Sequence, residues 1–216
     1  MTGTKAQALS TWAQQRGQAM LRFDYSGHGQ SDGQFEDGTI SAWLEDTLAA
    51  IDALTEGPLV LVGSSMGGWL SLLAARARPE RVAALLLIAP ATDFVTRLMI
   101  PSLPDAAKAA LARDGHWAMP SAYAAAATIL TQQLLDDGAL HCLLPGPIAF
   151  GGPVRILQGQ EDPDVPWRHA LDTAAAIASP DVRITLVKDG DHRLSRPDDI
   201  ALLLQEADQL CAAVSA

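Results

Sequence analysis

A G-x-S-x-G motif occupies residues 63–67, directly between an apolar run at 59–62 and a helical stretch from 66 to 77. In a strand–turn–helix context the flanking glycines allow a sharp turn, and the central serine projects at the positive end of the helix. The motif therefore predicts Ser65 as a nucleophile for acyl transfer. The alternative interpretation is a Ser- and Gly-rich turn in which Ser64 or Ser65 caps the helix.

A serine hydroxyl needs a general base, and five histidines compete for that role. His192 lies in a polar loop just after the last expected strand, 182–187, where the active edge of a parallel sheet would place a base. We therefore predict His192 as the base, with an ordinary surface-loop histidine as the alternative. The other four lie in an early loop, in the middle section and in a later helix: His28, His116, His141 and His169.

The acid that orients the histidine should follow the preceding strand, 154–157. The loop there carries three carboxylates, Glu161, Asp162 and Asp164, and position alone does not separate them. At least two of these carboxylates must be ordinary solvated turn residues.

The negative charge that develops on a substrate oxygen needs backbone N–H donors. One is expected from Met66, the residue after the nucleophile, which would form part of an oxyanion hole. A second donor normally comes from a loop after an earlier strand, and the sequence does not identify that loop.

Short β-like runs alternate with helical stretches, which predicts an α/β fold with a mostly parallel sheet and helices on both faces. Strands are expected at 19–23, 59–62, 81–88, 154–157 and 182–187. Helices are expected at 5–16, 39–54, 66–77, 169–177 and 198–213, with a long loop at 24–38. Residues 91–152 contain no clear strand, only Ala-rich helical pieces such as 105–113 and 123–135. We therefore predict a core from 1–90 and 153–216 with a helical cap insertion at 91–152.

The composition, 49% hydrophobic and 19% charged over 216 residues, is that of a globular chain. A net charge of -10 without a basic cluster argues against nucleic acid as a partner. The longest apolar runs are too short to span a bilayer, so we expect no stable membrane insertion. Two cysteines, Cys142 and Cys211, indicate no disulfide framework and favour a reducing, cytoplasmic compartment. Neither cysteine lies in a CxxC pair or beside a cluster of histidines, so no metal site is expected.

At these residues the chain resembles the α/β-hydrolase superfamily, and more narrowly the branch of the mitochondrial palmitoyl-protein thioesterases that also act on acyl glucuronides. The similarity covers nearly the whole chain, including the expected cap. The matching stretches are 3–6 (GTKA), 22–27 (RFDYSG), 31–33, 62–70, Trp117, 119–121, 141–144, 165–167 and 191–193.

The resemblance implies the identity of the acid. The family pattern G-x-x-D-x-x-V-P falls on Gly159, Asp162, Val165 and Pro166, which selects Asp162 over its neighbours. It also implies S-depalmitoylation or carboxylesterase activity without a metal or organic cofactor. The expected substrate is a small acyl ester or acyl thioester, with S-acylated proteins as a further class. In a eukaryote with a transit peptide ahead of this sequence, the mitochondrial matrix would replace the cytoplasm as the compartment.

One departure from the family pattern concerns the N-terminal strands, which are apparently missing. Family members carry about two or three further strands ahead of the match at residues 3–6, and the last of these is followed by the second oxyanion donor. We therefore expect a fragment or a misplaced start, an inactive chain, or a strand borrowed from a partner.

The leading hypothesis is thus a serine hydrolase that forms an acyl-enzyme on Ser65, with Asp162 and His192 as the other catalytic residues. One alternative is a binding protein on a catalytically impaired hydrolase scaffold, motivated by the missing strands. The other is a peptidase of the same fold, since these residues do not separate amide from ester cleavage. The oligomeric state is not predicted.

Overall fold

The chain forms two compact units in a computed structural model that describes residues 2–119 and 127–215. Unit 1 comprises Met1–Phe23, Leu48–Thr92 and Leu143–Ala216, and unit 2 comprises Asp24–Thr47 and Asp93–Cys142. The core and cap boundaries expected from the sequence, at 91 and 152, stay a prediction.

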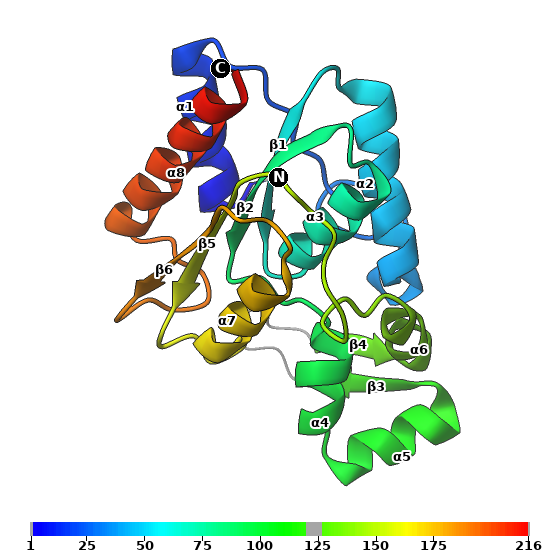
Figure 1. The fold of residues 1–216 in the computed structure, drawn as a ribbon. Helices are drawn as coiled ribbons and strands as arrows, with labels where there is room; N and C mark the ends of the chain where they lie inside the picture. Colours follow the sequence, from blue (N-terminus) through cyan, green and yellow to red (C-terminus); the bar gives the residue numbers. More distant parts are fainter. Residues whose placement is uncertain (1, 120–126, 216) are drawn as a thin grey trace. The chain divides into compact units, whose positions relative to one another are not determined.

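Unit 1 is built on a four-stranded parallel sheet with the strand order β1-β2-β5-β6 (Figure 1). Its strands are β1 (Leu59–Ser64), β2 (Val82–Ile88), β5 (Val154–Gly159) and β6 (Val182–Val187). The side chains of Leu85, Leu87 and Ile156 are fully buried, as expected for parallel strands that are covered on both faces. These four strands confirm the predictions made from their apolar sequences.

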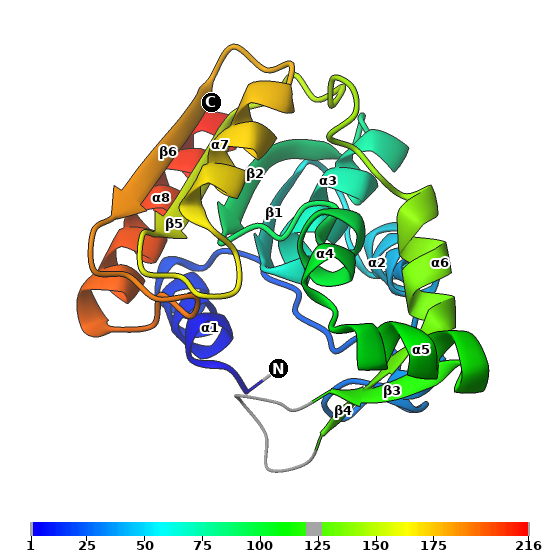
Figure 2. The same ribbon diagram turned by 90° about the horizontal axis from the view of Figure 1, so that it is seen from below.

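Helices cover both faces of this sheet (Figure 2). On one face α3 (Met66–Ala77) packs on β1 and β2, and α7 (Trp167–Ala176) packs on β5 and β6. On the other face α8 (Pro197–Ser215) contacts β2, and α1 (Thr4–Arg16) packs against α8. A further helix, α2 (Ile40–Leu54), is divided between the two units. All five helices confirm the predictions to within a few residues.

The strand expected at 19–23 is wrong, because these residues have no regular secondary structure. A strand is stabilised by backbone hydrogen bonds to a neighbouring strand. In the described part of the chain the sheet ends at β1, and no strand pairs with 19–23. Met20 and Leu21 accordingly remain about two-fifths exposed, at 41% and 42%.

Unit 2 combines short helices with a small antiparallel sheet. Its elements are η1 (Phe35–Asp37), η2 (Val95–Met99), α4 (Ile100–Ser102), α5 (Asp105–Asp114), β3 (His116–Met119), β4 (Thr128–Thr131) and α6 (Gln132–Leu140). β3 pairs with β4 so that Trp117 lies opposite Leu130. The expectation of a purely helical segment at 91–152 is therefore wrong for these eight residues. The β-branched residues Thr128 and Ile129 favour a strand, but four-residue runs are too short to stand out among alanine-rich helices.

The helix expected at 123–135 is only partly tested. Residues 123–126 lie outside the described part of the chain, residues 128–131 form β4, and helix begins at Gln132. Thr131 caps this helix, because its side-chain oxygen accepts a hydrogen bond from the Leu134 N–H. This cap explains why the helix starts here and not earlier.

Candidate active site

Ser65 lies at the junction of β1 and α3 with a strained backbone, φ 55° and ψ −121°. A positive φ is rare for a non-glycine residue and costs about 1–3 kcal/mol. The turn is held to the end of β2: the Ser65 N–H donates to the Ile88 carbonyl at 2.9 Å, and the Ser65 carbonyl accepts from the Ala91 N–H at 3.1 Å. Gly63 is required here, because a β carbon would lie 2.2 Å from the Gly67 carbonyl oxygen. The expected sharp turn is therefore present.

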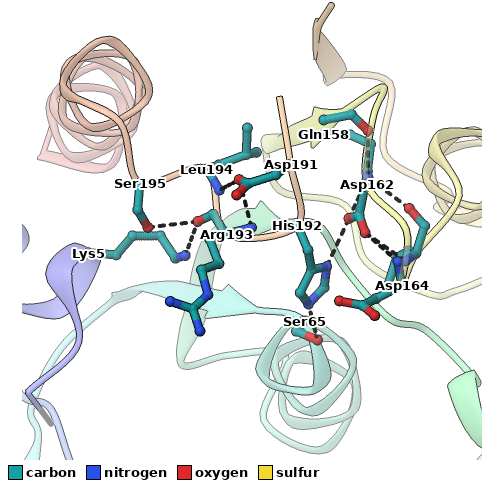
Figure 3. Close-up of polar contacts among 12 residues, drawn as sticks. Lys5, Ser65, Gln158, Asp162, Asp164, Asp191, His192, Arg193, Leu194 and Ser195 are labelled. Atoms are coloured by element: carbon teal, nitrogen blue, oxygen red, sulfur yellow. Dashed lines mark hydrogen bonds and ion pairs between the residues drawn. The ribbon is translucent and has the colours of Figure 1, made fainter. Parts of the chain in front are cut away.

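His192 contacts both expected partners (Figure 3). Its Nε2 lies 3.0 Å from the Ser65 Oγ, and its Nδ1 lies 2.8 Å from the Asp162 Oδ2. Because a carboxylate only accepts hydrogen bonds, the proton of the neutral imidazole is assigned to Nδ1, which leaves Nε2 able to accept the serine proton. All three residues belong to unit 1. The structure thus brings together the three side chains predicted from the sequence.

Asp162 is buried, with a relative exposure of 8%. Burial raises the pKa of this carboxyl, but hydrogen bonds from His192 and from the Val165 and Asp164 N–H groups outweigh burial. The net pKa of Asp162 lies below its ordinary value, so the carboxylate is ionised at neutral pH. A buried anion beside Nδ1 holds the imidazole in position and stabilises its protonated form.

The two neighbouring carboxylates have different surroundings. The side chains of Glu161 and Asp164 are exposed, whereas that of Asp162 is buried. Asp164 contributes its backbone N–H, which donates to the Asp162 Oδ1 at 2.8 Å. The geometry therefore supports Asp162 as the acid. Position in the sequence alone did not separate it from the other two carboxylates.

Gln158 is a residue that the sequence analysis missed. It lies near the end of β5 with no exposed surface, and its Nε2 donates to the Asp162 Oδ2 at 3.0 Å and to the Val165 carbonyl at 3.0 Å. The amide thereby gives the carboxylate a donor beside His192 and ties the acid loop to its own strand. A polar amide that follows the apolar pair Ile156-Leu157 in the strand Val-Arg-Ile-Leu-Gln is the signal that could have revealed it.

The four competing histidines have other contacts. In unit 1 the buried His169 Nε2 lies 2.7 Å from the Thr92 carbonyl. In unit 2 the His141 Nε2 lies 2.7 Å from the Ser41 Oγ, and the His116 Nδ1 lies 3.0 Å from the Asp114 carbonyl. The His28 ring packs edge-on against the Trp43 ring with centroids 5.1 Å apart. Each of these four histidines therefore makes a contact outside the group formed by Ser65, Asp162 and His192.

The Asp162, Asp164 and His192 side chains offer ligand atoms that all lie within 4.8 Å of one another. Such a group resembles a partial metal site. However, the Asp162 oxygens already accept from the imidazole, the Gln158 amide and two backbone N–H groups. This donor set suits a carboxylate that orients a histidine better than one that binds a cation, so we interpret the group as acid and base.

Met66 is the first residue of α3, immediately after Ser65. The first N–H groups of a helix have no partner within the helix and carry its partial positive charge. The Met66 N–H is therefore suited to bind an oxyanion formed on the substrate, and this role stays a prediction.

A parallel sheet with a strained serine between strand and helix, and an acid and a histidine in the two following loops, defines the class of α/β-hydrolases. Residues 2–141 match the family described as serine aminopeptidase, S33. The chain is 43% identical over 212 residues to the mitochondrial palmitoyl-protein thioesterase ABHD10 of Homo sapiens. The matched region covers 97% of this chain and 69% of that protein.

Solved structures agree with this assignment. Mouse α/β-hydrolase domain-containing protein 10 is 42% identical with a TM-score of 0.90, covering 99% of this chain and 86% of that one. A hydrolase structure from Agrobacterium vitis is 45% identical with a TM-score of 0.94, covering 97% and 83%. The chain belongs to the α/β-hydrolase family that includes the mitochondrial palmitoyl-protein thioesterases. Both the fold class and the resemblance read from the sequence are confirmed.

Proposed function

We propose that this protein is a serine hydrolase that cleaves an ester or thioester through an acyl-enzyme on Ser65. The single observation that supports this most strongly is the continuous hydrogen-bonded chain from the Asp162 Oδ2 through His192 to the Ser65 Oγ, with distances of 2.8 and 3.0 Å. A binding protein that does not catalyse a reaction does not need these three side chains hydrogen-bonded to one another. The hydrogen-bonded series therefore favours an enzyme over a binding protein.

In the first step the Ser65 Oγ attacks the acyl carbonyl carbon while its proton passes to the His192 Nε2. The Asp162 carboxylate stabilises the imidazolium that forms. The oxygen of the tetrahedral intermediate accepts from the Met66 N–H at the start of α3. The bond from carbon to sulfur or to the alcohol oxygen then breaks, and the leaving group takes the proton from Nε2.

In the second step a water molecule attacks the acyl-Ser65 carbonyl. The His192 Nε2 accepts a proton from that water and later returns it to the Ser65 Oγ as the acyl–oxygen bond breaks. The products are a carboxylic acid and free enzyme. Because the same imidazole acts in both steps, its loss should abolish acylation and deacylation together.

The substrate class follows from the relatives. The proteins that are 43% identical are named palmitoyl-protein thioesterases. We carry over to this chain the acyl-thioester chemistry, with a small acyl ester or an S-acylated protein as substrate. The acidic surface of this chain does not favour a nucleic acid partner.

A peptidase remains the second candidate, because the matching family is described as serine aminopeptidase. The same three side chains can cleave an amide. A competition between a palmitoyl thioester and an aminoacyl amide separates the two candidates. Faster turnover of the thioester supports the proposal, and faster turnover of the amide replaces it with a peptidase.

We propose a reducing compartment for the protein, either the cytoplasm or the mitochondrial matrix. Cys142 and Cys211 form no disulfide with each other, and the named relatives are mitochondrial. In the part of the chain that the structure describes, no helix is long and apolar enough to cross a bilayer.

A fluorophosphonate probe tests the nucleophile. We expect it to label the wild-type protein and Ser64→Ala, because Ser64 occupies the variable position of the motif. Labelling should be lost in Ser65→Ala. A Ser65→Ala protein that still reacts would exclude Ser65 as the nucleophile.

A further inference from the structure

The loop that carries His192 contains a strained residue two positions later. Leu194 has φ 41°, which is rare for a residue other than glycine. Its side chain is only 2% exposed and belongs to the buried cluster that also contains Leu9 of α1 and Leu203 of α8. The loop must therefore turn sharply, so that the His192 ring points to the site while the Leu194 side chain enters the core.

The strain at Leu194 would be relieved if the peptide between Arg193 and Leu194 turned over. Such a flip changes φ of Leu194 and reverses the directions of the Arg193 carbonyl and the Leu194 N–H. Because this peptide begins one residue after His192, fixing its orientation also restrains the loop that carries the imidazole.

Hydrogen bonds on both sides of this peptide oppose the flip (Figure 3). On one side the Asp191 Oδ1 accepts from the Leu194 N–H at 2.9 Å and from the Arg193 N–H at 3.1 Å. On the other side the Arg193 carbonyl accepts from the Ser195 Oγ at 2.9 Å and from the Lys5 Nζ. The Asp191 and Ser195 contacts are local to the loop, whereas Lys5 reaches it from α1, 188 positions away.

We propose that Lys5 is a positioning residue for His192, acting through the Arg193 carbonyl. This inference rests on the proposed function, since it gives the GTKA stretch at residues 3–6 a role in holding the general base. Lys5 does not contact substrate in this account. It keeps one peptide of the loop in the strained orientation in which the imidazole faces both the Asp162 Oδ2 and the Ser65 Oγ.

The surroundings of Lys5 support this role. α1 is anchored by the buried Leu9, so the amine projects from a fixed helix. Burial lowers the pKa of Lys5, and the nearby Asp191 carboxylate partly offsets that shift. A half-buried amine that has lost part of its hydration needs a protein acceptor, and the Arg193 carbonyl provides it.

The kinetic test compares Lys5→Met with Arg16→Met. Arg16 lies at the other end of α1 and pairs with Asp208, so its variant is a matched loss of a cation from the same helix. We expect Lys5→Met to lower kcat toward a short acyl ester about tenfold with KM within twofold, since small misplacement of a catalytic group acts on kcat. Arg16→Met should stay within about twofold of wild type, and Lys5→Arg, which keeps a donor, should recover most of the lost rate.

A double variant tests the shared carbonyl. Lys5 and Ser195 donate to the same oxygen, so each single loss leaves one donor. The loss of kcat in Lys5→Met/Ser195→Ala should exceed the product of the two single losses. Independent effects, or a Lys5→Met loss no larger than that of Arg16→Met, would overturn the proposal.

A second readout does not depend on turnover. The proton between the His192 Nδ1 and Asp162 should give a downfield NMR resonance that is absent in His192→Ala. We expect Lys5→Met to broaden or remove that resonance at a temperature where the protein is fully folded, whereas Arg16→Met keeps it. An unchanged resonance in Lys5→Met contradicts the role of Lys5. A wild-type protein that keeps this resonance but neither reacts with the probe nor hydrolyses esters would instead contradict the proposed function.

Discussion

Gly159 and Gly190 touch at the point where the acid loop meets the histidine loop. A β carbon on Gly159 would lie 2.2 Å from the Gly190 carbonyl oxygen, and that same oxygen accepts a hydrogen bond from the Glu161 N–H at 2.9 Å. Real β carbons essentially never approach backbone so closely. The short distance from Asp162 to His192 therefore depends on the absence of a side chain at residue 159.

Gly159→Ala should separate these two loops. We expect kcat to fall about 10- to 100-fold, because a misplacement of about 1 Å is enough for such a loss. Ester hydrolysis by the purified variant measures this effect. Gly151→Ala is the control, since a β carbon there meets nothing within 4 Å. Equal activity of the two variants would show that the loops do not need this close contact.

Gln158→Leu should destabilise the acid loop. The Asp162 Oδ2 and the Val165 carbonyl would each lose a donor inside the protein, which costs about 1–3 kcal/mol. Urea unfolding of the variant and the wild type measures the difference. A variant as stable as the wild type would mean that water replaces the amide.

Asp162→Asn should change how stability depends on pH. The pKa of Asp162 lies below its ordinary value of 3.8, because burial, which raises it, is outweighed by hydrogen bonds from His192 and backbone N–H groups. A depressed native pKa means that the ionised carboxyl stabilises the fold fully above the unfolded pKa. That contribution is lost as the pH falls through the native pKa.

The difference in the free energy of unfolding between wild type and Asp162→Asn should therefore be larger at about pH 5 than in more acidic solution, and it should shrink as the pH falls below about 4. Denaturant unfolding at a series of pH values provides the comparison. A difference that persists unchanged into the acid range would contradict an ionised, stabilising Asp162.

Leu85→Ala should destabilise the sheet of unit 1. Leu85 in β2 is fully buried, and the loss of such a side chain costs about 2–5 kcal/mol. Leu54→Ala is the control, because Leu54 is 66% exposed and should cost less than about 0.5 kcal/mol. Thermal unfolding separates the two variants. Similar losses would mean that β2 is not part of the main core.

The nucleophile and the base could be predicted from the sequence because each follows a recognisable strand. Ser65 stands between an apolar run and a helix, and His192 follows the last β-branched run. The acid was harder to predict from the sequence, because Glu161, Asp162 and Asp164 share one loop. Burial and hydrogen bonds, which depend on the folded structure, distinguish Asp162.

The remaining differences come from contacts between distant segments. Residues 19–23 have the composition of a strand, but a strand also needs a partner, which no local pattern reveals. Strands β3 and β4 have four residues each, and each is stabilised by hydrogen bonds to the other, so neither run alone indicates a strand. The hydrogen bond from Lys5 to the Arg193 carbonyl joins residues at opposite ends of the chain, so spacing in the sequence could not predict it.

The most direct test of the central claim is the rate of acyl-thioester hydrolysis by Ser65→Ala, His192→Ala and the double variant. If Ser65 and His192 act as one unit, each single variant should lose about 10⁴-fold or more in kcat, and the double variant should lose about as much as either one. A His192→Ala protein that keeps more than about a tenth of the wild-type rate, or losses that multiply in the double variant, would contradict the account.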